Sequence, residues 1–93
     1  MKKYSSEIKH YINEGRGSID SAKKFVNISN YKGAINSLNS AIISFTNLGI
    51  VATNSYNDKA LKLSAKLIKK CKHVRYLCFK KMNAVEIEKN QCI

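Results

Sequence analysis

The sequence predicts an all-α protein, folded as a small antiparallel three-helix bundle in one domain. Ninety-three residues, 44% of them hydrophobic, are enough for a single small core. The chain has no Pro and only four Gly, which suits long helices with short connections. The clearest signal lies between Tyr31 and Leu48, where apolar residues recur every three or four positions, the repeat of one face of an α-helix.

The first predicted helix runs from about Ser5 to Ile28. Its apolar stripe is Ile8, Ile12, Ile19, Ala22 and Val26. Gly15 occupies a stripe position, and together with Gly17 it lowers helix propensity by ~2 kcal/mol. The pattern therefore fits a continuous helix and a helix broken here, with Ser18 capping a second one, equally well. A glycine on the buried face also indicates a close approach by a neighbouring helix.

The second predicted helix follows a short connection at Ser29-Asn30, so it lies antiparallel to the first. Asn30 is a good N-cap for a helix that opens at Tyr31. The helix is expected to end at Gly49 in the left-handed conformation, with Ile50 folding back as its hydrophobic partner. Its stripe is Tyr31, Ala34, Ile35, Leu38, Ala41, Ile42, Phe45 and Leu48.

Residues 33–57 carry no charged side chain and are numerous enough to span a bilayer. Several Asn, Ser and Thr residues fall within this stretch, however, and mostly on one face of the predicted helix. The segment is therefore expected to be an amphipathic packing helix and not a transmembrane segment.

The third predicted helix follows a loop at residues 53–55 and runs from Tyr56 to about Met82 or Ile87. Ser55 and Asp58 resemble a capping box. The inner stripe is Ala60, Ser64, Leu67, Cys71, Val74 and Cys78, flanked by Leu61, Ile68 and Met82. The domain is expected to cover residues 1–85, and residues 86–93, which have no strong pattern, are expected to form a frayed tail.

The charge of the chain is strongly positive, with 17 Lys and Arg against 6 acids and a net charge of +11. Most of the excess lies on the third predicted helix, on Lys59, Lys62, Lys66, Lys69, Lys70, Lys72, Arg75, Lys80 and Lys81. Such a face indicates an anionic partner, and the alternative is a solvated surface with no partner. Nucleic acid, an acidic peptide and an anionic membrane surface all satisfy the charge requirement.

The residues that usually carry chemistry do not combine into a site in this sequence. His10 and His73 are the only histidines, and no acid lies at a neighbouring helical position to orient His73, so no enzyme, metal site or cofactor is predicted. The three cysteines show no zinc-ligand spacing and are expected to be reduced core thiols. The N-terminus lacks the apolar run of a signal peptide, so the protein is expected to be intracellular, in the cytoplasm.

Residues 18–82 resemble the microtubule-interacting and trafficking (MIT) domains. The resemblance lies in Asn30-Tyr31, Ala34 and Ala41, and in Asp58-Lys59-Ala60 at the start of the third helix. Tetratricopeptide helices share the Tyr-x-x-Ala spacing and the later Ala. The MIT pattern usually has Gly where this chain has Ser29, and its third helix is usually acidic where residues 71–75 are basic.

The resemblance to MIT domains implies a non-enzymatic module that binds a partner helix or acidic peptide in a groove between helices. Such a groove needs apolar seats and a charged rim. The third helix offers Leu63, Leu67 and Leu77 as seats and Lys62, Lys66, Lys69 and Lys70 as the rim.

Two other functions fit the sequence. One is a basic nucleic-acid-associated bundle, and the other is a small accessory, immunity or phage-type protein that acts by binding. The sequence does not decide whether the bundle self-associates, although Tyr4, Tyr11 and Phe25 could leave an apolar strip for a second copy to cover.

Overall fold

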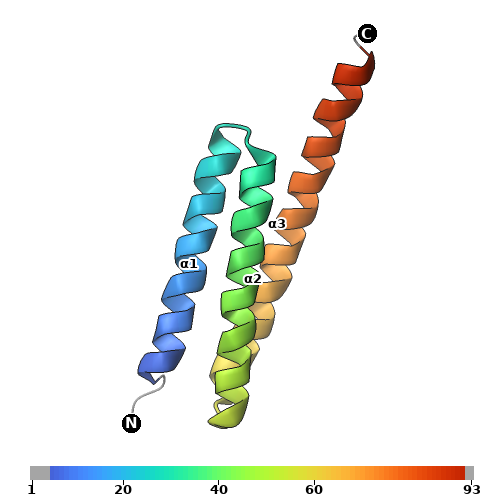
Figure 1. The fold of residues 1–93 in the computed structure, drawn as a ribbon. Helices are drawn as coiled ribbons and strands as arrows, with labels where there is room; N and C mark the ends of the chain where they lie inside the picture. Colours follow the sequence, from blue (N-terminus) through green and yellow to red (C-terminus); the bar gives the residue numbers. More distant parts are fainter. Residues whose placement is uncertain (1–4, 92–93) are drawn as a thin grey trace.

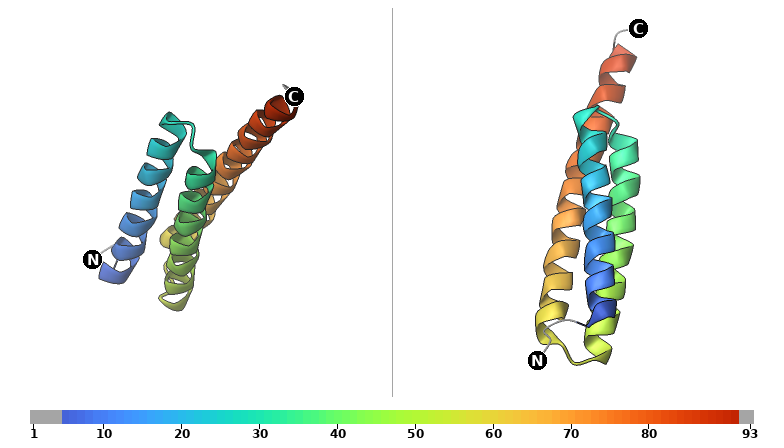
Figure 2. Two further views of the ribbon diagram at one scale, coloured as in Figure 1. Left: turned by 45° about the horizontal axis from the view of Figure 1, so that its top comes forward. Right: turned by 90° about the vertical axis from the view of Figure 1, so that its left-hand side faces the viewer.

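The computed structural model describes residues 5–91, with side chains described as far as residue 84. Three helices follow one another in the chain: α1 (Ser6–Asn27), α2 (Tyr31–Asn54) and α3 (Asp58–Gln91) (Figure 1). The predicted all-α three-helix bundle is confirmed. α2 packs along both of its neighbours, whereas α1 and α3 meet only sparsely (Figure 2).

The first helix is continuous, which decides between the two alternatives at its glycines. Ser5 caps α1 by accepting a 3.2 Å hydrogen bond from the amide of Ile8. Gly15 is buried directly beneath the Phe45 ring of α2, so that a Cβ here would overlap the ring. Gly17 faces open space. The helix therefore tolerates two glycines because one of them allows α2 to approach closely.

The connection between α1 and α2 follows the prediction. Asn30 caps α2, because its Oδ1 accepts a 3.0 Å hydrogen bond from the amide of Gly33. Ser29 lies in the left-handed region with φ 59°. The amide of Asn30 donates to the carbonyl of Phe25 at 2.8 Å, which closes the turn.

The predicted end of the second helix at Gly49 is wrong, because α2 continues to Asn54. No glycine among residues 5–91 has a positive φ, so Gly49 is not a left-handed cap. Gly49 instead faces α3, where a Cβ would lie 2.8 Å from the Ser64 hydroxyl. That hydroxyl donates a 2.7 Å hydrogen bond to the carbonyl of Phe45. The glycine thus allows α3 to pack closely against the backbone of α2.

The predicted capping box of Ser55 and Asp58 is also wrong. The Ser55 hydroxyl donates to the carbonyl of Val51 at 2.8 Å and so belongs to the end of α2. Asn57 occupies the position before α3, and its Oδ1 accepts from the amide of Ala60 at 3.1 Å. Tyr56 between them is left-handed, with φ 53°, and 92% exposed.

The third helix is longer than predicted. It continues to Gln91, so the segment 86–93 that was expected to fray is helical as far as this residue, and residues 92–93 lie outside the described part of the chain. No Gly or Pro interrupts the chain after Asp58, and Ala84, Glu86 and Lys89 are good helix formers. The end of α3 projects beyond the α1–α2 turn (Figure 1), which gives the molecule a length of 62 Å.

The core lies along both sides of α2. Its fully buried members include alanines where helices cross and larger residues between them: Ile8, Ala34, Ala41, Phe45, Leu48, Ala52, Ala60 and Cys71. Leu67 and Val74, predicted for the inner stripe of α3, pack half-buried against this core. Tyr11 and Phe25 also pack half-buried against it, whereas Tyr4 lies outside the described residues.

Within the described residues, α2 is the one helix long and apolar enough to cross a membrane, with a mean hydropathy of 1.2 over its most apolar 18 residues. Its position between two helices accounts for this composition, because a helix with neighbours on two sides needs a wide apolar face.

Candidate interaction groove between α1 and α3

An open groove, here called the α1–α3 groove, runs between α1 and α3 over α2. It exists because both outer helices pack on α2 and scarcely touch each other. The part of the groove near the α1–α2 turn is a cavity of about 250 Å³. Apolar side chains from all three helices line this cavity: Ile19, Ala22 and Val26 of α1, Leu38 of α2, and Cys71 and Val74 of α3. Lys23, Asn27 and Lys70 complete the lining with polar groups.

A second cavity lies further down between the same two helices. It has a volume of about 450 Å³ and is lined by Lys9, Ile12, Asn13 and Arg16 of α1 and by Leu63 of α3. α1 and α3 run in the same direction, because each is antiparallel to α2. The two cavities therefore follow one another along a single groove.

The structure brings only part of the predicted site into this groove. Leu63 and Lys70 line its cavities, and Leu67, between them on α3, packs half-buried against the core. Leu77 is 44% exposed and lines neither cavity. Lys62, Lys66 and Lys69 are exposed and also line neither cavity. Most of the predicted lysine rim therefore does not line the cavities of the groove.

The first helix supplies the basic residues of the groove that sequence reasoning missed. Lys9, Arg16 and Lys23 all line its cavities and recur every seven residues, or about two helical turns. Their spacing beside the apolar stripe of α1 was the signal in the sequence. With Lys70 on the opposite wall, they give the groove positive charges on both sides.

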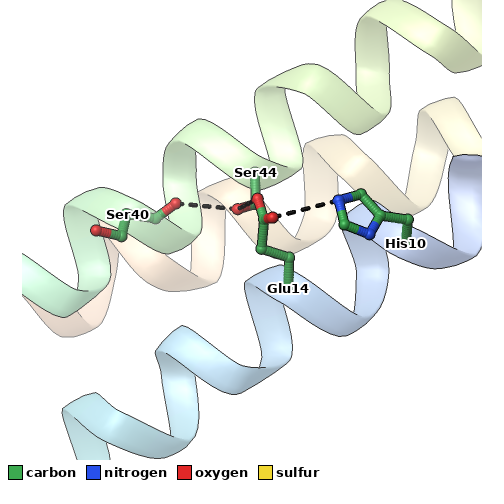
Figure 3. A network of polar contacts seen from close by, with 4 residues as sticks. All are labelled: His10, Glu14, Ser40 and Ser44. Atoms are coloured by element: carbon green, nitrogen blue, oxygen red, sulfur yellow. Dashed lines mark hydrogen bonds and ion pairs between the residues drawn. The ribbon is translucent and has the colours of Figure 1, made fainter.

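Within residues 5–84, no carboxylate forms an ion pair with these groove cations. The contact between a basic side chain and a carboxylate that these residues contain joins His10 Nε2 to Glu14 Oε2 at 3.3 Å, and it is an ion pair only when His10 is protonated. Glu14 Oε1 also accepts a 2.8 Å hydrogen bond from the Ser44 hydroxyl of α2, so this acid points toward α2 (Figure 3). The groove therefore presents unpaired positive charge to solvent.

A depression on the other side of α3 is a weaker candidate. It is lined by residues of α2 and α3 that include Ile50, Leu61 and Ile68, and no charged residue is among them. Of these two surfaces, the α1–α3 groove is the one that combines apolar walls with the basic rim that an acidic peptide requires.

The thiols of Cys71 and Cys78 are buried, and Cys71 forms part of the cavity wall. Burial raises the pKa of Cys78, and it raises the pKa of Cys71 against the opposing effect of the nearby charges of Lys70 and Arg75. Cys92 lies outside the described residues. Raised pKa values keep both thiols in the neutral form, which is poorly nucleophilic.

These raised pKa values predict a loss of stability in alkali. A thiol whose pKa is higher in the folded state keeps its proton there at a pH where the same thiol in the unfolded chain has lost it. The contribution of the neutral thiols to the free energy of unfolding is therefore fully present below the unfolded pKa of about 9. It falls as the pH rises above that value. Urea unfolding between pH 8 and pH 10.5 measures this fall. The Cys71→Ala/Cys78→Ala variant should show a shallower fall, and an identical fall would assign the effect to other groups.

No group of three His, Cys, Asp or Glu side chains that could hold a metal ion occurs within the described part of the chain. Comparisons with protein-family models, with curated proteins and with solved structures give no match. The resemblance to MIT domains thus stays a prediction from the sequence.

Proposed function

We propose that this protein is a non-enzymatic interaction module that binds an acidic amphipathic helix in the α1–α3 groove. The observation that carries the proposal is the apolar cavity of about 250 Å³ with Lys23 on one wall and Lys70 on the other. Sites for small molecules usually measure about 300–1,000 Å³, so this cavity suits a single large side chain of a partner better. The proposal also agrees with what the resemblance to MIT domains implies.

The partner helix would place one apolar residue, such as Leu or Met, in the cavity formed around Val26 and Val74. Lys9, Arg16 and Lys23 follow one another at seven-residue spacing, so a helix lying along the groove would offer acids at the same spacing. Burying one Leu side chain stabilises a complex by about 1.5–3 kcal/mol. Exposed ion pairs contribute about 0.2–1 kcal/mol each, so the apolar anchor supplies affinity and the charges select orientation and partner.

Binding of a designed peptide to the full chain tests this function. The probe is a fluorescein-labelled 18-residue helix with acids every seven residues and one Leu beside the end acid that would face Lys23, and its binding is followed by fluorescence anisotropy. Lys23→Glu with Lys70→Glu should weaken binding at least tenfold, or about 1.4 kcal/mol. The matched control, Lys24→Glu with Lys69→Glu, makes the same charge change on exposed residues outside the cavity and should change affinity less than threefold.

Replacing this Leu of the peptide with Ala should also weaken binding about tenfold or more, because the cavity then stays empty. Equal losses in the two double variants would show that only the overall charge attracts the peptide. No measurable binding of the unchanged peptide would reject the groove as its site.

A further inference from the structure

A second surface of α3 carries a row of exposed side chains, most of them lysines, on the side opposite the core. We call it the lysine stripe and define it as Lys59, Lys62, Lys66, Lys69, His73, Tyr76 and Lys80. The spacing alternates between three and four residues throughout, so these side chains form one row along the helix. All seven are exposed, whereas Ser64, Cys71 and Cys78, on the opposite side of the helix, are buried against the bundle.

The length of the stripe follows from helix geometry. From Lys59 to Lys80 the helix rises by about 32 Å at 1.5 Å per residue. α3 is drawn without a break over this stretch (Figure 1), so the row is not interrupted by a turn. None of its lysines lines the cavities of the α1–α3 groove. The stripe therefore adjoins the proposed peptide site on α3 without lining its cavities.

The lysines of the stripe lack anionic partners within residues 5–84. Asp58 is the sole acid of α3 in that range, and it forms no ion pair there. The contact that the stripe does make is internal, with the Lys80 ammonium 5.7 Å from the centre of the Tyr76 ring. Like charges three and four residues apart on a helix repel each other, and a bound polyanion relieves this repulsion.

We infer that the lysine stripe binds the phosphate backbone of nucleic acid without preference for sequence. Lysine is a compact point charge that suits phosphates, and contacts to phosphates carry no sequence information. Exposed His73 and Tyr76 interrupt the row with rings that can stack on bases. A helix that lies on a membrane inserts an apolar face, but the stripe contains no aliphatic residue and the apolar face of α3 packs on α2. The stripe thus fits nucleic acid better than a lipid surface.

Fluorescence anisotropy with a labelled 20-base-pair DNA duplex and the full chain tests the inference. Four phosphate contacts, from Lys59, Lys62, Lys66 and Lys69, predict a slope of about −3.6 for the logarithm of affinity against the logarithm of salt concentration. The affinity should accordingly fall roughly 100-fold between 50 and 200 mM KCl. A slope near zero would overturn the inference.

Two double variants locate the binding surface. Lys62→Gln with Lys66→Gln should lower the slope by about 2 and weaken binding at 50 mM KCl at least tenfold. Lys24→Gln with Lys32→Gln removes the same charge from exposed residues of α1 and α2 and should change affinity less than twofold. Equal losses of affinity in both variants would show that binding depends on net charge alone and would overturn the assignment to the lysine stripe.

A parallel measurement separates nucleic acid from membrane. Vesicles with 30% phosphatidylserine, at the same salt concentration and the same total concentration of anionic groups, should capture less protein than the duplex. Tighter capture by the vesicles would overturn the assignment to nucleic acid. A saturating amount of the groove peptide should not displace the duplex completely, because no lysine of the stripe lines the cavities of the groove. Complete displacement would contradict the placement on the stripe.

Discussion

Replacing Phe45 with Ala is expected to lower the free energy of unfolding by about 3–5 kcal/mol. Phe45 is 0% exposed and lies where the three helices meet: its ring covers Gly15 of α1, and its carbonyl accepts a hydrogen bond from Ser64 of α3. Removing the ring leaves a cavity between α1 and α2 that an alanine cannot fill. Urea denaturation followed by circular dichroism at 222 nm measures the change.

Phe79→Ala is the matched control, because Phe79 is 42% exposed on α3. Its loss should lower stability by less than about 1 kcal/mol, since a half-solvated ring gives up little burial. Phe45→Leu keeps most of the buried volume and should retain a folded state if the alanine variant does not fold. Equal effects of Phe45→Ala and Phe79→Ala would contradict the central position of Phe45.

The two glycines in the middle of α1 are expected to respond to alanine in opposite directions. Gly15→Ala places a methyl group against the buried Phe45 ring and should lower the free energy of unfolding by about 2 kcal/mol. Gly17 meets no atom within 4 Å, so Gly17→Ala should raise stability by about 1 kcal/mol through helix propensity alone. The urea midpoints of the two variants should fall on opposite sides of the parent midpoint.

A double-mutant cycle shows whether the ring causes the effect at Gly15. In a Phe45→Leu background the aromatic ring is absent, so Gly15→Ala should become far less harmful or neutral. An unchanged loss in that background would place the cause within α1 itself.

The positions of the three helices could be predicted because their signals are local. The apolar repeat and the cap at Asn30 depend on residues within a few turns of each other, and both hold in the structure. Gly49 misled the prediction because glycine has two uses, as a helix end and as a site of close packing. The residue that decides between them is Ser64, 15 positions away in the chain, and only the packing of α3 brings it there.

The candidate site was harder to predict because it belongs to two helices at once. The predicted site included Lys70 but not Lys9, Arg16 and Lys23 on α1, because no sequence pattern shows which helices face each other. The spacing of Lys62, Lys66 and Lys69 already placed them opposite the apolar stripe. This position fits an outward face better than a rim over the core.

The arrangement in which α2 alone touches both other helices has a consequence for how the chain folds. Each helix contacts its neighbour in sequence and almost nothing else, so α1 with α2 and α2 with α3 form two hairpins that share one member. The chain closes short loops before it gains long contacts, which is the condition for folding on the order of microseconds to milliseconds. Coupling between the outer helices therefore passes mainly through α2, as it does between the units of a repeat protein.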